Sequence, residues 1–98
     1  MKKDLKEIMI ELRELRPFIE QKYSVNTIEI FGSFVRNQQD QNSDLDILIT
    51  FSETPSLLKF IELKNYLSEQ LGLNVDLVMK DSLKPRIGKT ILSEAIAI

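Results

Sequence analysis

The sequence predicts an α/β fold in which helices and strands alternate in the order α-β-α-β-α-β-α. Three short runs are rich in β-branched and aromatic residues, and in the segments around them apolar residues recur every three or four positions. The first pattern is typical of strands and the second of amphipathic helices. Helices between strands imply a layered sheet with a helical cover. The length of 98 residues supports a single domain, residues 1–98.

The chain begins with a predicted helix over about residues 3–22, whose apolar residues form one face. Pro17 lies inside this pattern and could kink the helix or mark a boundary. The next run, Val25–Phe31, is predicted to be a strand. Gly32-Ser33 ends that strand, and a short helix over Phe34–Gln38 is expected after it.

The polar segment Gln39–Ser43 is predicted to be a loop. Leu45–Phe51 follows as a strand that is apolar on both faces, which indicates cover on both sides. A long helix over residues 57–71 is expected to stop at Gly72. Val75–Met79 is the third strand. A final helix is expected after Pro85, with these apolar residues along one face: Ile87, Ile91, Ala95 and Ile98.

The amino-acid composition excludes several kinds of functional site. Cysteine and histidine are both absent, which excludes disulfides, a histidine general base and the usual zinc sites. A divalent metal would need oxygen ligands, as magnesium and manganese prefer. The net charge of −2 gives no sign of direct nucleic-acid binding. No apolar run approaches membrane-spanning length and the first residues are charged, so we expect a cytoplasmic protein without membrane contact.

Three aspartates occur in apolar strand sequences. Asp44 and Asp46 flank Leu45, and Asp76 lies in the third strand. Burial would strip an unpaired carboxylate of its hydration, so a metal or a basic partner must compensate. Side chains two apart on a strand share one face, and their α-carbons lie about 7 Å apart. The first two carboxylates can therefore converge on one metal centre.

An ordinary structural role is the alternative for these aspartates. Asp44 would then cap a turn, and the other two would face water at strand edges. The spacing to the earlier Gly-Ser pair argues against this. A Gly-Ser pair followed at this distance by Asp-x-Asp arises by chance in roughly one chain in a thousand of this length.

Gly32 and Ser33 have a physical logic of their own. Glycine allows a sharp backbone turn and the close approach of a ligand. A serine at the start of a helix lies among free backbone N–H groups that attract phosphate. The alternative is an ordinary serine N-cap. A strand that ends in Gly-Ser, beside a strand with Asp-x-Asp, would combine a phosphate cradle with a metal site.

Together, residues 30–36 (IFGSFVR) and 43–49 (SDLDILI) resemble the signature of the DNA polymerase beta-type nucleotidyltransferase superfamily. The small size and the strand at 75–78 (VDLV) resemble its minimal nucleotidyltransferases in particular. The resemblance extends from about residue 23 to the end. It implies a three-stranded mixed sheet flanked by helices.

The resemblance also implies the roles of the aspartates. Asp44 and Asp46 would bind two magnesium ions, and Asp76 would help to bind one of them. Two such ions stabilise the attacking and leaving oxygens of an in-line displacement. Asp76 is then the best candidate to orient or deprotonate an acceptor hydroxyl.

Nucleotide binding is the second implication. Gly32 and Ser33 would bind the triphosphate of ATP, the substrate, and Arg36 is a candidate partner for it. A solvated helix residue is the alternative for Arg36. Val35 and Asn37 replace small residues that the family often has there, which affects the turn geometry but not the metal site.

The last implication is a partner. Minimal members of the family are commonly paired with small helical HEPN-type toxins, so this chain would be the antitoxin that adds AMP to a tyrosine hydroxyl of its partner, within a hetero-oligomer. One alternative is a module that neutralises the partner by binding alone. The other is a transferase for a small molecule such as an antibiotic, although 98 residues leave no room for the helical domain that such enzymes usually carry.

Overall fold

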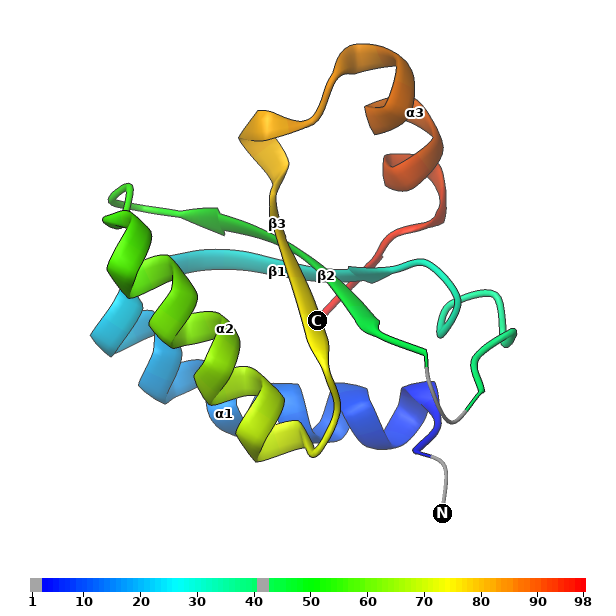
Figure 1. Cartoon of the computed structure of the whole chain (residues 1–98), viewed down its shortest axis with the longest axis horizontal. Coiled ribbons are helices and arrows are strands. Elements are labelled where there is room, and N and C mark those ends of the chain that lie inside the picture. The colour runs from blue at the N-terminus through cyan, green and yellow to red at the C-terminus, as the bar shows by residue number, and fades with distance from the viewer. Residues whose placement is uncertain (1–2, 41–42) are drawn as a thin grey trace.

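A computed structural model describes residues 3–40 and 43–98 (Figure 1). Two positions of the predicted loop Gln39–Ser43, residues 41 and 42, lie outside the described residues. The elements along the chain are α1 (Leu5–Tyr23), β1 (Val25–Phe31), β2 (Leu45–Phe51), α2 (Leu57–Leu71), β3 (Val75–Met79), the 3-10 turn η1 (Lys80–Ser82), α3 (Pro85–Glu94) and β4 (Ile96–Ala97).

The four strands form one mixed sheet in the order β3-β2-β1-β4. β1 and β2 are antiparallel, β2 and β3 are parallel, and β4 pairs antiparallel with β1. The mixed sheet that the family resemblance implies is therefore confirmed, with one strand more than predicted. A strand of two residues carries no periodicity, so sequence patterns cannot detect β4.

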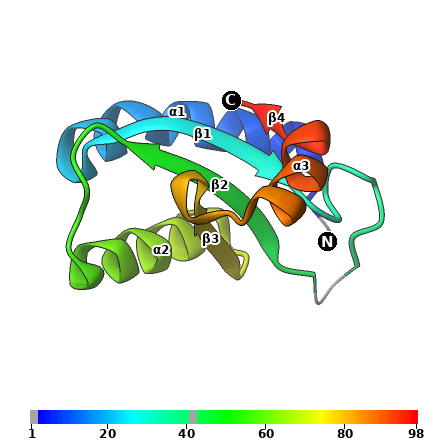
Figure 2. The same cartoon turned by 90° about the horizontal axis from the view of Figure 1, so that it is seen from above.

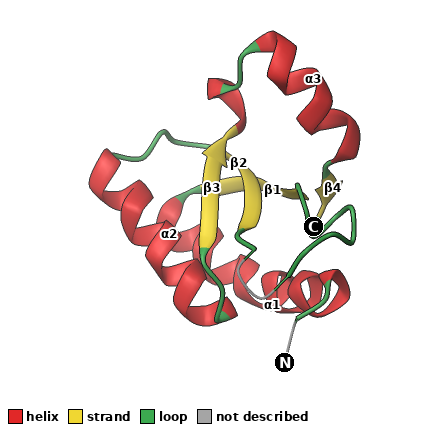
Figure 3. Cartoon of the chain, turned by 45° about the vertical axis from the view of Figure 1, so that its right-hand side comes forward, coloured by secondary structure: helices red, strands yellow, loops and turns green. Residues whose placement is uncertain are grey.

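Two helices cover one face of the sheet, and the third lies on the opposite side (Figures 2 and 3). The buried side chains of α1 and α2 pack against alternate residues of β2 and β3 and against Val25, Ile28 and Ile30 of β1, where a bulge interrupts the alternation. The fully buried members of this core include Ile8, Leu12, Leu63, Leu45, Ile47 and Val75. This layer is a rigid support for the residues on the other face.

The caps of α1 and α2 explain where these helices begin and end. The Asp4 side chain accepts a hydrogen bond from the Glu7 amide, and the Ser56 side chain accepts one from the Lys59 amide. Gly72 ends α2 in the left-handed region, as its position after the apolar pattern predicts. α1 continues through Pro17 up to Tyr23, so Pro17 marks no boundary.

The predicted helix over Phe34–Gln38 is wrong. Residues 33–37 form hydrogen-bonded turns, in which the amides of Val35 and Arg36 both donate to the Gly32 carbonyl. Asn37 has a φ of +56°, a left-handed conformation that stops helical propagation. The order is therefore not α-β-α-β-α-β-α, because β1 and β2 are joined without a helix.

The predicted last helix is too long. α3 ends at Glu94, and Ala95 is its C-cap in an extended conformation. Ile98 therefore lies outside the helix, and its amide donates to the Ile28 carbonyl of β1. Among the described helices, none combines the length and the apolar character needed to cross a membrane.

Candidate active site

The end of β1 and the start of β2 bring two predicted site residues together. Phe31, the last residue of β1, is the register partner of Asp46. Gly32 follows with a φ of +85°, which L side chains rarely adopt. A Cβ on Gly32 would overlap the Asp46 carboxylate and lie 3.0 Å from its Cγ. Gly32 thus leaves the space that the Asp46 carboxylate fills.

Asp46 and Asp76 are neighbours across the parallel pairing of β2 with β3. Both lie on the face opposite α1 and α2, because Leu45, Ile47 and their neighbours at alternate positions face the core. The helices α1 and α2 support β2 and β3, and these two strands therefore fix the relative positions of the two carboxylates. This juxtaposition depends on strand pairing and is not visible in the sequence.

The three aspartates differ in burial. Asp46 is partly buried, whereas Asp44 and Asp76 are exposed. The expectation that all three aspartates lie in apolar strands is wrong for Asp44, which precedes β2. Asp76 lies within β3 as predicted, but it is exposed on this edge strand. The cost of lost hydration falls on Asp46.

The charges around Asp46 shift its protonation. Burial raises the pKa of the Asp46 carboxyl from its ordinary 3.8 to about 6, and the negative charges of Asp76 and then Asp44 contribute to the rise. A hydrogen bond with the Asp76 side chain acts in the same direction, while the Arg36 guanidinium opposes it. A bound cation would favour the ionised form of such a carboxyl.

Asp44 is held by a residue that the sequence analysis did not single out. Asn74 Nδ2 donates to Asp44 Oδ1 at 2.9 Å, and the Leu45 amide donates to the Asn74 carbonyl at 2.9 Å. Asn74 lies just before β3, where the sequence gives only the signal of an ordinary turn residue. Its side chain thus connects the residue that precedes β3 with the residue that precedes β2.

The carboxylates suit a hard divalent cation in chemistry, but they are not gathered into a ligand cage. Over residues 3–40 and 43–98, no three acidic side chains are close enough together to hold a metal ion. Asp46 and Asp76 are in contact, and Asp44 acts on Asp46 through its charge. Magnesium binds oxygen ligands, and its positive charge would offset the repulsion between these carboxylates. The donor chemistry of the Asp46–Asp76 pair therefore fits magnesium, while the described side chains form no set of three carboxylates.

The predicted phosphate cradle at a helix start is not formed, since no helix follows Ser33. Ser33 is half-buried in the turn, and its carbonyl accepts a hydrogen bond from the Gln38 amide at 2.9 Å. Phe34 is buried in the core and anchors this turn to α1 and the sheet. The rigid turn carries Gly32 and Arg36 at its edges.

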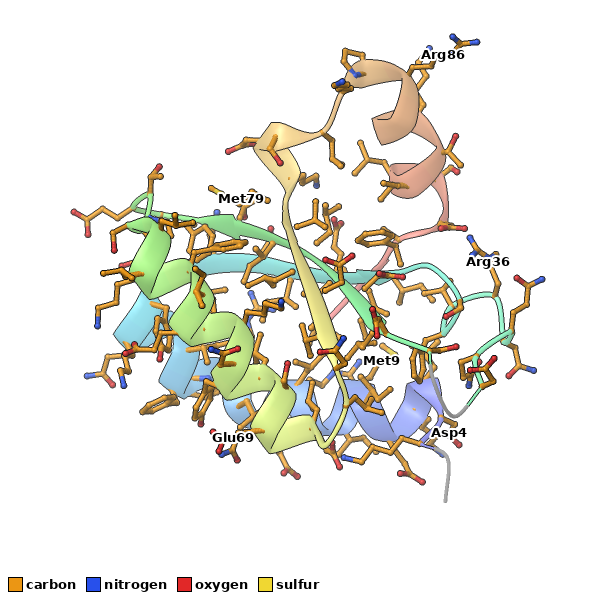
Figure 4. The ribbon with its side chains drawn as sticks, in the orientation of Figure 1. Asp4, Met9, Arg36, Glu69, Met79 and Arg86 are labelled. Carbon is orange, nitrogen blue, oxygen red and sulfur yellow. The ribbon has the colours of Figure 1, made fainter. Side chains whose placement is uncertain are left out.

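Two hydrogen-bond donors of the turn, the Gly32 amide and the Arg36 guanidinium, face the end of α3. The Gly32 amide donates to Glu94 Oε1 at 3.2 Å. Arg36 Nη1 lies 3.1 Å from Glu94 Oε1 and 3.0 Å from Oε2, and Arg36 Nε donates to Gln38 Oε1. Figure 4 places Arg36 on the turn after β1, beside the C-terminal end of α3. Glu94 lies 58 positions from Arg36, so no local pattern could have identified it.

Comparisons with known proteins agree with this architecture. Residues 12–98 match the model of the nucleotidyltransferase domain family. The protein adenylyltransferase MntA of Thermococcus cleftensis is 49% identical over 94 residues, which cover 96% of this chain and 95% of the relative. A provisionally named protein adenylyltransferase of Methanocaldococcus jannaschii is 47% identical over 97 residues, or 98% of this chain and 99% of the relative.

Two solved structures are similar over most of the chain. A candidate minimal nucleotidyltransferase superposes with a TM-score of 0.83 at 31% identity, covering 98% of this chain and 97% of the other. A chain of a toxin–antitoxin crystallised with AMP-PNP superposes with a TM-score of 0.69 at 26% identity, covering 94% of this chain and 69% of the other.

Proposed function

The chain belongs to the nucleotidyltransferase family, and we propose that it transfers AMP from ATP to a tyrosine hydroxyl of a HEPN-type toxin and thereby acts as the antitoxin. It is an enzyme of the protein adenylyltransferase type, with relatives of that name at 47–49% identity over nearly its whole length. The toxin–antitoxin structure with AMP-PNP supports ATP as the substrate and a toxin as the partner. Tyrosine as the acceptor follows from the family resemblance.

One observation carries the proposal. The Asp46 carboxylate lies against the Gly32 turn, and Asp76 is its neighbour across the sheet. The Gly32 amide and the Arg36 guanidinium of the turn bind a carboxylate, that of Glu94. Carboxylates next to anion-binding donors suit a reaction between a metal-bound triphosphate and a hydroxyl nucleophile.

Magnesium is the cofactor that we assign to the aspartates. Asp44, Asp46 and Asp76 would hold it, with two ions expected from the resemblance. Bound there, magnesium would neutralise charge on the triphosphate and stabilise the attacking and leaving oxygens. Burial and then the negative charges of Asp76 and Asp44 raise the pKa of Asp46, and a bound cation would offset this cost, which supports the assignment.

The roles of the other site residues follow from their donors and acceptors. The Gly32 amide and the Arg36 guanidinium bind the triphosphate, with the Ser33 hydroxyl as a further contact. Asp76, exposed at the sheet edge, orients the tyrosine hydroxyl and accepts its proton. The phenolic oxygen forms a bond to the α-phosphorus as the bond from that phosphorus to the β-phosphate oxygen breaks. Pyrophosphate leaves with that bonding pair.

The proposal includes the organisation of the molecule. The 98 residues act as one cytoplasmic domain and bind the acceptor protein in a hetero-oligomer, without direct contact to nucleic acid or membrane. The radius of gyration of 12.8 Å fits a single compact unit of this length.

The direct test is incubation of the chain with a HEPN-type toxin, magnesium and ATP labelled at the α-phosphate. We expect the label on the toxin, the mass of AMP on a tyrosine-containing peptide, and no transfer when magnesium is chelated. A toxin with that tyrosine changed to phenylalanine is the acceptor control.

The Asp44→Asn/Asp46→Asn double variant is the matched control for the enzyme, and it should transfer nothing. Transfer by this variant at the normal rate would refute the metal assignment. Neutralisation of the toxin without any label would favour an antitoxin that acts by binding alone. Label on a small molecule and not on the toxin would favour the small-molecule transferase.

A further inference from the structure

Glu94 engages two of the groups assigned to the triphosphate. Its Oε1 accepts from the Gly32 amide at 3.2 Å, and both of its oxygens lie within 3.1 Å of Arg36 Nη1. The Glu94 side chain is 21% exposed, whereas that of Arg36 is 48% exposed. The carboxylate is thus the less exposed partner of this ion pair, and it contacts both the backbone and the arginine of the turn.

A carboxylate and a phosphate compete for such donors. Both are anions that accept from a backbone N–H and from a guanidinium. Two anions at the same donors would repel each other. If Gly32 and Arg36 bind the triphosphate, Glu94 must therefore leave before the nucleotide can bind.

The helix that carries Glu94 is weakly attached to the rest of the protein. Among the α3 residues whose burial is described, Gly88 alone is buried and none belongs to the core cluster. Leu92 is 46% exposed, and Lys84 gives the helix no side-chain N-cap. The described residues thus give α3 few buried apolar contacts, and a segment of this kind opens at low free-energy cost.

The chain after Glu94 is firmly held. Ile96 and Ala97 pair with β1, and the Ile98 amide donates to the Ile28 carbonyl at 3.0 Å. Arg16 Nη1 donates to the Ile98 carbonyl at 3.0 Å. α3 thus has a fixed point immediately after its last residue, about which it can swing without loss of the sheet.

From these contacts we infer that Glu94 is an internal competitor of the nucleotide. Its carboxylate occupies the phosphate position in the free protein, and α3 is released from the turn when ATP binds. The inference rests on the proposed function, because it takes Gly32 and Arg36 as triphosphate ligands. It assigns to the C-terminal helix control over nucleotide affinity.

Calorimetric titration with ATP and magnesium tests the inference. Glu94→Gln removes the charge and keeps the shape, so it should tighten ATP binding about three- to tenfold, the range expected for a partly exposed charged pair. Glu94→Ala should do the same or more. The matched control is Glu20→Gln, which breaks the Arg16–Glu20 ion pair on α1 and should leave ATP affinity unchanged.

The outcomes separate this inference from the proposed function. If the wild type binds ATP and the Glu94 variants bind it no more tightly, Glu94 is no competitor while the nucleotide site stands. If none of the proteins binds ATP, both ideas fail. Hydrogen exchange supplies an independent readout: saturating ATP should accelerate amide exchange in α3 of the wild type, and Glu94→Gln should accelerate it without ATP. Protection of α3 by ATP would overturn the inference.

Discussion

At the scale of single residues, Gly32 is needed for both its conformation and its missing side chain. Alanine there would meet the Asp46 carboxylate in addition to the strain of a φ of +85°. We expect Gly32→Ala to lower the free energy of unfolding by about 2–3 kcal/mol and to weaken ATP binding. Urea denaturation and calorimetry measure the two effects.

Gly72→Ala is the matched control for that change. Gly72 also has a positive φ, +66°, but the nearest atom to an added Cβ is Lys3 Nζ at 4.0 Å. This variant should cost only about 1 kcal/mol of backbone strain and leave ATP affinity unaltered. Equal effects of the two substitutions would mean that the overlap with Asp46 has no consequence.

The raised pKa of Asp46 predicts a pH-dependent effect of its neutralisation. The folded protein favours the protonated carboxyl, with a pKa of about 6 against 3.8, so ionisation of Asp46 costs stability as pH rises through this window. Asp46→Asn should therefore raise the free energy of unfolding by about 1–2 kcal/mol at pH 8, and by nearly nothing below pH ~4.

Urea denaturation at several pH values, without divalent metal, measures this gain. Addition of magnesium should stabilise the wild type and not Asp46→Asn. A variant that is less stable than the wild type at pH 8 without metal would contradict the electrostatic account.

At this scale, the sequence predicts contacts between residues that are close in the chain but not contacts between residues that are far apart in it. The period of two on a strand predicts that Asp44 and Asp46 point the same way, but only strand pairing sets Asp46 beside Asp76. Glu94 gives no signal at all, because its partners at Gly32 and Arg36 belong to a turn far away in the chain. Contacts of this kind exist only once the topology is known.

At the scale of secondary-structure elements, α1 contains an avoidable cost. Pro17 has no N–H to donate within the helix, and it is exposed, so no packing compensates for the missing hydrogen bond. We expect Pro17→Ala to raise the free energy of unfolding by about 1–2 kcal/mol, measured by urea denaturation. Glu14→Ala, an exposed change on the same helix, should stay within about 0.5 kcal/mol. A Pro17→Ala protein no more stable than the wild type would show that α1 has adapted fully to the proline.

The elements that the sequence predicted correctly are those whose pattern repeats at least twice, which takes only about four residues in a strand but more than seven in a helix. The strands at Val25–Phe31, Leu45–Phe51 and Val75–Met79 have the predicted bounds, and α2 stops at Gly72. The expected helix over Phe34–Gln38 spans little more than one turn, too short for periodicity to distinguish from hydrogen-bonded turns. Short elements depend on tertiary contacts, here the burial of the Phe34 side chain.

At the scale of the whole molecule, one face of the sheet forms the hydrophobic core and the other carries the candidate site. One face of the sheet buries the core against α1 and α2, and the other carries Asp46 and Asp76. α3 lies on the side of the sheet opposite α1 and α2 (Figure 3). Changes at the chemical face can therefore alter activity without loss of the fold. The mixed sheet was predictable from the family resemblance, whereas the attachment of β4 and the contact from α3 were not.

This separation allows catalysis to be removed while partner binding is kept. Asp76 is exposed on the edge strand, so Asp76→Asn should preserve the fold, ATP binding with magnesium and toxin binding. AMP transfer should fall at least ~100-fold, because no carboxylate remains to accept the tyrosine proton. Mass spectrometry of the toxin measures the transfer, and Asp81→Asn, also exposed just after β3, is the control that should retain it.

Cells that make the toxin should lose protection with Asp76→Asn. Full protection with an unmodified toxin would mean that binding alone neutralises it, and AMP transfer would then fail as the explanation of the antitoxin effect.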